Sequence, residues 1–85
     1  MLRLLDEAMD LGGRGVALIW LQTPGETVPH EGMKLRDARG RVHEVAAVTR
    51  EQHVYTLFLP GGDAAYFERL FRNVLVDARV FEEVE

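Results

Sequence analysis

The sequence predicts an α+β fold in which a small, mostly antiparallel, curled sheet of five strands packs with two helices in the order α-β-β-β-β-α-β. Two observations support this fold class: a meander of strands separated by turn residues between Gly32 and Gly62, and segments of helical periodicity on either side. The chain has 85 residues, 47% of them apolar, so residues 1–85 are expected to form a single globular domain.

The first part of the chain is predicted to be a helix followed by a strand. Apolar residues recur at helical spacing over residues 2–11, and Gly12-Gly13 would end that helix with a left-handed cap. Gly15–Gln22 is continuously apolar, as in a strand buried on both faces. Thr23–Glu26 has Pro and Gly at its central positions, which predicts a type II turn.

The meander itself consists of three predicted strands, Met33–Asp37, Arg41–Thr49 and Val54–Leu59. Asp37–Gly40 joins the first two as a tight turn, because Asp can accept a hydrogen bond from the backbone ahead of it and Gly tolerates positive φ. Pro60–Gly62 ends the third strand, because proline has no N–H for the ladder.

The last part of the chain is predicted to be a second helix and a final strand. Asp63 is a good N-cap for a helix whose apolar face carries Tyr66, Phe67, Leu70 and Phe71. Val74–Phe81 is β-branched enough to form the fifth strand. Strands joined by short loops are expected to be antiparallel. The fifth strand either closes a small barrel, which resembles the SH3-like barrels in fold alone, or extends an open sheet.

Composition limits the functional classes. The chain has no cysteine, so disulfides, thiolate chemistry and cysteine-ligated metal sites are excluded. No apolar run approaches the ~18 residues of a membrane helix and no signal-peptide core is present, so we expect a cytoplasmic protein without a membrane partner. Nine of the ten basic residues are Arg and only one residue is Asn, which leads to the hypothesis of a bacterial, thermophilic source.

Two predicted strands, Val16–Leu21 and Val54–Leu59, have apolar residues on both faces. Two short helices cover only one face of a five-stranded sheet. Either the sheet curls around its own core, or its second face is buried by a partner, for which a second copy of the chain is the commonest solution. We therefore predict a homo-oligomer with Trp20, Tyr55 and Phe58 in the interface. The alternative is that these three residues are simply half-exposed.

A second candidate surface is the basic hairpin formed by Lys34, Arg36, Arg39 and Arg41, with Asp37 as its one acidic residue. Outward basic side chains on a hairpin can bind nucleic-acid phosphates or an acidic protein. The chain's net charge of −4 argues against nucleic acid. Basic residues at a sheet edge also prevent aggregation between strands, and we favour that solvated edge.

A third candidate is a zinc or general-base site formed by His30, His43 and Glu44. No metal-binding motif supports it, and histidines in polar surface loops are the favoured interpretation. Strict alternation along the strand places Glu44 on the apolar face with Val42, so we expect either a bulge that turns Glu44 outward or a partly buried carboxylate.

The glycine loop at Pro60–Asp63 is a weak phosphate-binding candidate, and a plain turn with an N-cap is favoured there. No cofactor is predicted. The leading hypothesis is a non-enzymatic, self-associating interaction module.

Overall fold

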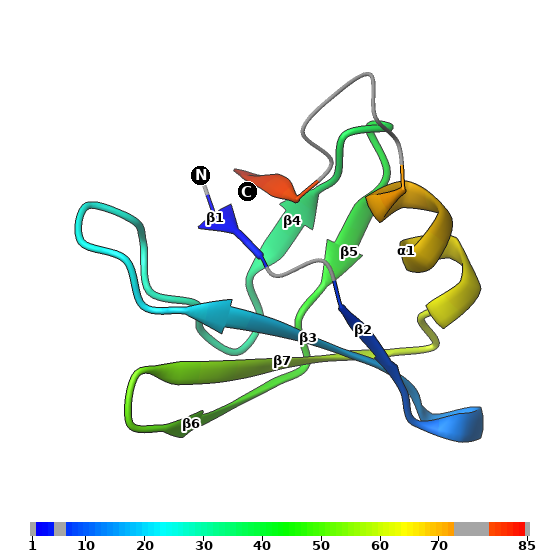
Figure 1. Cartoon of the computed structure of the whole chain (residues 1–85), viewed down its shortest axis with the longest axis horizontal. Coiled ribbons are helices and arrows are strands. Elements are labelled where there is room, and N and C mark those ends of the chain that lie inside the picture. Colours follow the sequence, from blue (N-terminus) through cyan, green and yellow to red (C-terminus); the bar gives the residue numbers. More distant parts are fainter. Residues whose placement is uncertain (1, 5–6, 73–78, 85) are drawn as a thin grey trace.

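The structure is a computed structural model, and it describes residues 2–4, 7–72 and 79–84 of the chain. Within these residues, two four-stranded antiparallel sheets lie on opposite sides of the core, and α1 (Ala64–Phe71) packs beside them (Figure 1). The first sheet has the strand order β1-β8-β4-β5, and the second has the order β2-β3-β7-β6.

The first sheet contains the two ends of the described chain. Its strands are β1 (Leu2–Arg3), β8 (Val80–Val84), β4 (Lys34–Arg36) and β5 (Val42–Glu44). Strand β1 pairs with β8, so the first and last strands lie side by side (Figure 1). The hairpin formed by β4 and β5 then extends this sheet on the other side of β8.

The second sheet is built around the long central pair of β3 (Gly15–Leu21) and β7 (Val54–Pro60). The two edge strands are β2 (Ala8–Asp10) and β6 (Ala47–Glu51). Strand β3 therefore pairs with a strand more than thirty residues later, and not with the strand that follows it in the sequence.

A short 3-10 turn, η1 (Gly12–Arg14), connects β2 to β3, and Gly15 follows it at a close approach between backbones. Gly15 has φ +122°, and a Cβ atom there would lie 2.3 Å from the carbonyl oxygen of Leu59. Only glycine fits this position, because a side chain would collide with the paired strand β7.

The chain crosses from the first sheet to the second between two adjacent residues. Val45 exchanges backbone hydrogen bonds with the segment before β4: its N–H donates to Met33 O at 2.9 Å, and its carbonyl accepts from Gly32 N at 2.7 Å. The next residue, Ala46, donates instead to Phe58 O in β7 at 2.9 Å. Val45 is fully buried, so this crossing lies in the core.

The core lies between the sheets and is closed on one side by Phe67 and Leu70 of α1. Its largest fully buried side chain is Trp20, whose Nε1–H donates to Glu26 Oε2 at 2.6 Å. Both sheets and the helix contribute to the cluster, which includes Leu2, Leu4, Val16, Leu18, Leu35, Val45, Leu57 and Phe81.

The predicted fold class is wrong in its architecture. The described residues contain two four-stranded sheets and one α-helix, and these sheets do not form one closed barrel. The predicted first helix is replaced by β1 and β2. Leu2 and Leu4 are buried and Arg3 is exposed, which is the alternation of a strand. Apolar residues in two such short strands also satisfied a helical spacing by chance.

The predicted strand Arg41–Thr49 is broken by the sheet crossing into β5 and β6. The predicted last strand, Val74–Phe81, falls partly on residues 73–78, outside the described residues, and β8 spans Val80–Val84. The second predicted helix is confirmed as α1, with Asp63 as its N-cap: Asp63 Oδ1 accepts from Ala65 N at 2.9 Å.

Both predicted turns are confirmed. Glu26 N donates to Thr23 O at 3.2 Å across a turn in which Gly25 has φ +88°. Gly40 N donates to Asp37 O at 2.9 Å. No helix among the described residues is long and apolar enough to cross a membrane.

Candidate functional site

The turn between β4 and β5 is organised by the carboxylate of Asp37. Its Oδ1 accepts the backbone N–H groups of Arg39 at 2.9 Å and of Arg41 at 3.0 Å. The Asp37 N–H in turn donates to Arg41 O at 2.8 Å. This is the local hydrogen bonding that an Asp at the first position of a tight turn predicts.

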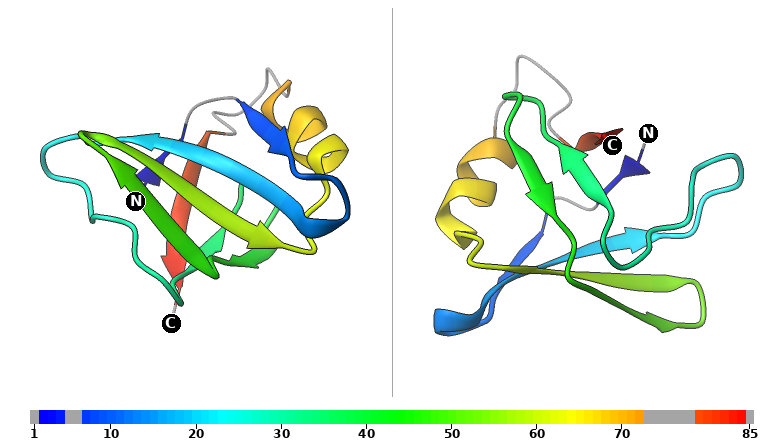
Figure 2. Two further views of the ribbon diagram at one scale, coloured as in Figure 1. Left: turned by 90° about the horizontal axis from the view of Figure 1, so that it is seen from below. Right: turned by 180° about the vertical axis from the view of Figure 1, so that it is seen from behind.

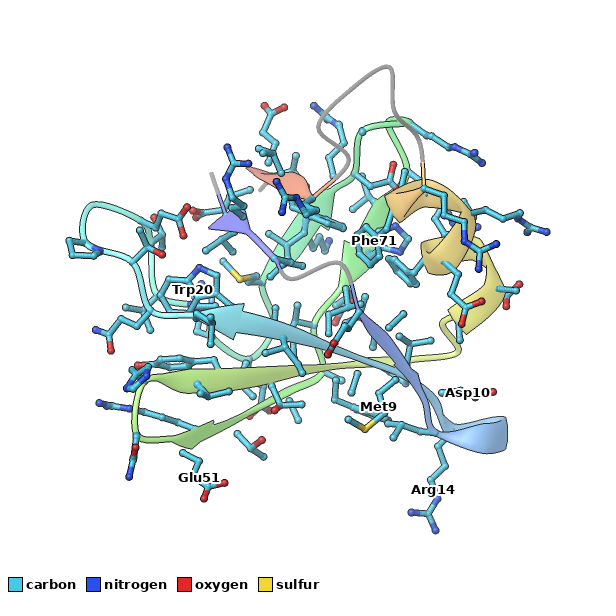
Figure 3. All side chains as sticks on the ribbon, viewed as in Figure 1. Met9, Asp10, Arg14, Trp20, Glu51 and Phe71 are labelled. Carbon is cyan, nitrogen blue, oxygen red and sulfur yellow. The ribbon has the colours of Figure 1, made fainter. Side chains whose placement is uncertain are left out.

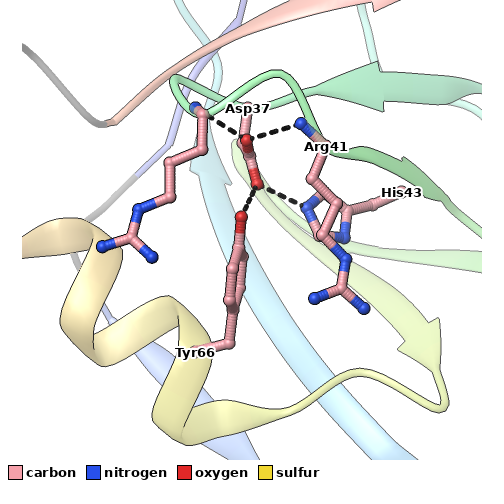
Figure 4. Close-up of polar contacts among 5 residues, drawn as sticks. Asp37, Arg41, His43 and Tyr66 are labelled. Carbon is pink, nitrogen blue, oxygen red and sulfur yellow. Dashed lines mark hydrogen bonds and ion pairs between the residues drawn. The ribbon is translucent and has the colours of Figure 1, made fainter.

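The second carboxylate oxygen of Asp37 reaches beyond the turn itself (Figure 4). Oδ2 accepts from His43 Nε2 at 2.8 Å and from the Tyr66 hydroxyl at 2.5 Å. His43 lies on β5 and Tyr66 on α1, so one carboxylate joins turn, strand and helix. We call Asp37, His43 and Tyr66 the Asp37 cluster. A carboxylate only accepts hydrogen bonds, so His43 Nε2 carries a hydrogen.

The Asp37 side chain is fully buried, and His43 is 9% exposed at its side chain. Burial by itself raises the pKa of Asp37, but the hydrogen bonds from His43, Tyr66 and the two backbone N–H groups outweigh it and hold that pKa below its usual value. Burial, the hydrogen bond to Asp37 and the negative charge of Asp37 raise the pKa of Tyr66 to about 12.

Aromatic rings and two guanidinium groups surround the cluster. The His43 ring lies 4.9 Å from the Phe67 ring, and the Tyr66 ring lies edge-on to Phe67 at 5.4 Å. The guanidinium carbons of Arg41 and Arg39 lie 4.8 and 5.7 Å from the centre of the Tyr66 ring, within cation–π range.

Chemically, the Asp37 cluster is a satisfied polar network. Tyr66 is neutral near pH 7 and donates its proton to a carboxylate that stays ionised, so neither group is poised to exchange a proton at that pH. A hollow of about 160 Å³ lies beside it, lined by Arg41, His43, Glu44 and Pro60–Gly62 among others. The network attaches α1 to the β4–β5 hairpin.

The predicted basic hairpin is divided by the structure into two pairs. Lys34 and Arg36 lie on β4 opposite acidic residues of neighbouring strands: Lys34 faces Glu44, and Arg36 faces Glu82. Arg36 Nη1 lies 3.8 Å from Glu82 Oε2, with both side chains largely exposed. Arg39 and Arg41 lie at the turn over Tyr66 instead. The four residues therefore do not form one continuous basic surface.

The three residues of the predicted metal site are separated by their contacts. His43 is directed inward to Asp37, whereas His30 is exposed, with its Nδ1 3.0 Å from Glu31 O. Glu44 does share a face of β5 with Val42, but that face is the solvent-exposed one: Val42 is 46% exposed, and the alternating residues His43 and Val45 point inward. Across residues 2–4, 7–72 and 79–84, no group of three His, Asp or Glu side chains could hold a metal ion.

The loop at Pro60–Asp63 is a turn followed by a helix cap. Gly62 N donates to Leu59 O at 3.2 Å, and the Asp63 carboxylate occupies the N-cap position of α1. A carboxylate at this position takes the place that an anionic ligand would need.

The residues predicted at an oligomer interface lie on two different faces of the second sheet. Trp20 and Tyr55 face inward and are 0% and 6% exposed, with their rings packed edge-on at 4.9 Å. Phe58 is half-buried and faces outward. It pairs across the strands with Ala17 of β3 and Ala47 of β6, and residues directly opposite each other in a sheet share a face.

The outward side of the second sheet is apolar across three of its strands. Viewed from below in Figure 2, the four strands lie in front of the rest of the described chain. Met9 is 52% exposed and Leu21 is 40% exposed. We define this outer face by its apolar residues Met9, Ala17, Ile19, Leu21, Val54 and Phe58, and the cross-strand register also places Thr49 and Thr56 on it.

Sequence reasoning predicted the turn role of Asp37 but missed its bonds to His43 and Tyr66. A tight-turn Asp has spare acceptor capacity, and that capacity was the signal available. Comparison of the chain with protein-family models, with curated proteins and with solved structures finds no match to any of them.

Proposed function

We propose that the protein is a self-associating interaction module of the bacterial cytoplasm, and that its contact surface is the outer face of the second sheet. The observation that carries the proposal is that the described chain covers the inner side of this sheet with core, whereas on the outer side the apolar residues Met9 and Leu21 are exposed and Ile19, Val54 and Phe58 are half-buried. Antiparallel sheets that face water on one side are normally polar on that side.

The apolar residues of the outer face form a continuous surface. Met9, Ala17 and Phe58 are cross-strand neighbours in one row, and Leu21 is opposite Val54 in another. Ile19 lies on β3 between these two rows and joins them along that strand, and its cross-strand neighbours in β7 and β6 are Thr56 and Thr49. A contiguous apolar surface of this kind marks an interaction site, whereas single exposed apolar residues do not.

The size of the face indicates a weak complex. An interface of standard size buries roughly 800 Å² of each partner. Four strands spaced ~4.8 Å apart and about six residues long cover a projected area of roughly 400 Å². We therefore expect association with a dissociation constant in the micromolar range, and a mixture of monomer and dimer at tens of micromolar chain.

Two matched substitutions test the proposal. Met9→Glu puts a carboxylate on the outer face, and Val42→Glu puts one on the first sheet, at a side chain that is 46% exposed. Sedimentation velocity from about 1 to 200 µM chain measures association of the native protein and of both variants, with circular dichroism as the check on folding. Met9→Glu is expected to weaken association by about tenfold or more. Val42→Glu is expected to leave it unchanged.

A native chain that remains monomeric over the whole range would overturn the proposed function. Equal weakening by the two substitutions would place the contact elsewhere on the molecule. The same preparation also tests the thermophilic source, for which we expect a melting temperature above the mesophile range of about 45–65 °C.

A second candidate function is binding of nucleic-acid phosphates at Arg39 and Arg41. Both guanidinium groups lie against one tyrosine ring at the tip of the hairpin, which orders two positive charges side by side. Two cations displace about two counterions, so binding to single-stranded RNA would be weak and steeply lost with salt. Fluorescence anisotropy that stays flat at 20 mM salt for the native chain would dispose of this candidate.

A further inference from the structure

We propose, building on the proposed function, that the partner at the outer face is a second copy of the chain, related by a twofold axis that places Arg14 of each copy over Glu51 of the other. The proposal rests on where the charges of the second sheet lie. Arg14 and Glu51 are at opposite ends of the sheet, and both project to the side on which Met9 lies, away from Trp20 (Figure 3).

The apolar surface lies between these two charges. Arg14 is in the η1 turn that leads into β3, beside the end of β3 that pairs with Pro60. Glu51 is the last residue of β6 and is opposite Val54, at the far end of the central strand pair. One end of the outer face is therefore positive and the other is negative.

The remaining charges of the strands in this sheet belong to the inner side. Asp10 is opposite Val16, and Arg50 is opposite Tyr55. Val16 and Tyr55 both point into the core, so the charged residues opposite them project toward that side at the sheet edges. Among the described strands of this sheet, Glu51 is the charged residue on the outward side, and Glu7, directly before β2, lines a hollow with the outward residues Met9 and Ile19.

The positive end at Arg14 and the negative end at Glu51 make the two ends of the outer face complementary to each other. When two copies stack face to face about a twofold axis perpendicular to the line between Arg14 and Glu51, the axis exchanges the two ends. Each apolar surface then covers the other. Two ion pairs form at the rim, each between Arg14 of one copy and Glu51 of the other. A twofold axis parallel to that line would instead bring like charges together.

A partner of different sequence would not need opposite charges at the two ends of the outer face. A second copy needs opposite charges that exchange places about the twofold axis, and Arg14 and Glu51 satisfy that condition. Within one chain, Arg14 and Glu51 are too far apart to affect each other directly, so any coupling between them reports contact between copies.

The test uses charge reversal at both positions. Arg14→Glu gives a copy with two negative ends, and Glu51→Arg gives a copy with two positive ends. Each single variant is expected to self-associate about threefold to tenfold more weakly than the native chain. The double variant Arg14→Glu/Glu51→Arg restores opposite ends, and its dissociation constant is expected to return to within about twofold of the native value.

Mixing the two single variants gives the sharper measurement. A heterodimer of Arg14→Glu with Glu51→Arg has two attractive pairs, whereas each homodimer has two repulsive ones. Native mass spectrometry of an equimolar mixture should therefore show the heterodimer well above the half of all dimers expected by chance. As a control, reversal of the Arg36 and Glu82 charges on the first sheet should leave association unchanged.

The failures of the two proposals are distinguishable. A native chain that dimerises and responds to Met9→Glu, but whose charge-reversed variants mix statistically, would overturn this arrangement and leave the proposed function standing. A native chain that is monomeric at all concentrations would overturn both.

Discussion

The hydroxyl of Tyr66 donates a 2.5 Å hydrogen bond to Oδ2 of Asp37, a residue 29 positions earlier in the chain. This bond attaches α1 of the described chain to the turn that joins β4 and β5. Because the same carboxylate also holds the turn through Oδ1, the position of the helix and the conformation of the turn depend on one side chain.

The substitution Tyr66→Phe should destabilise the protein measurably without changing its fold. It removes one hydrogen bond to a charged acceptor, which is worth about 1.5–3 kcal/mol, and the half-buried position of Tyr66 places the loss at the lower end. Urea unfolding measures the change. Tyr55→Phe is the matched control, because the structure gives no hydroxyl hydrogen bond for Tyr55 within the described chain. Equal losses in the two variants would contradict the role of the bond.

Asp37→Asn should cost more than Tyr66→Phe. An amide has one accepting oxygen, so it cannot accept from the backbone and from both His43 and Tyr66, and its NH₂ group would face two donors. We expect a loss of roughly 2–4 kcal/mol in the free energy of unfolding, because buried donors are left unsatisfied. Asp63→Asn is the control, since Asn is as good an N-cap as Asp and should change stability by only a few tenths of a kcal/mol.

The pH dependence of stability should have two limits set by the Asp37 cluster. The pKa of Tyr66 rises from 10.0 to about 12 on folding, so the unfolded chain loses this proton first and stability falls as pH rises from 10 to 12. The pKa of Asp37 is lowered from 3.8, so its contribution is present above that pH and is lost as the pH falls below it.

Absorbance titration of the phenol groups checks the alkaline limit directly. A tyrosine transition near pH 12 should be present in the native chain and absent in Tyr66→Phe. A variant that retained this transition would show that another group is responsible. In Tyr66→Phe, the fall in stability between pH 10 and 12 should also be smaller.

Gly15→Ala should be among the most damaging single substitutions in the second sheet. The added Cβ would lie 2.3 Å from the Leu59 carbonyl oxygen, at a residue with φ +122°, so β3 and β7 would have to separate. We expect a loss of about 3 kcal/mol or more in the free energy of unfolding. Gly13→Ala, with open space around its Cβ position, should change stability little, and a comparable loss there would contradict the explanation.

The turns and caps of this protein were predictable because they depend on local chemistry. In its turn or cap, each of Asp37, Gly25 and Asp63 acts through residues within four positions of itself, and each lies where the sequence placed it. The apolar strands at β3 and β7 were equally clear from their runs of buried residues.

The pairing of the strands was not predictable, because it depends on distant residues. Neither the pairing of β3 with β7 nor the pairing of β1 with β8 has a local signal. The break at Val45 also has none: Val42–Val48 looks like one alternating strand, and only the rest of the fold decides that Val45 belongs to one sheet and Ala46 to the other.

For the candidate surfaces, too, the local features were predictable from the sequence and the long-range features were not. The apolar runs of β3 and β7 put apolar residues on both faces of these two strands, but composition could not tell the inward Trp20 and Tyr55 from the outward Phe58. Assigning a face requires the register of neighbouring strands. His43 and Tyr66 were missed as partners of Asp37 because helix α1 meets the hairpin only in the folded chain.

The passage of the chain from Val45 to Ala46 has a consequence for how the protein unfolds. Consecutive residues are hydrogen-bonded to different sheets, so separating either sheet pulls directly on a buried residue of the other. Neither sheet retains a closed core without the other, so unfolding of one sheet alone is unfavourable. Amide hydrogens in β4, β5, β6 and β7 should exchange with one common opening free energy, as expected for a single cooperative unit.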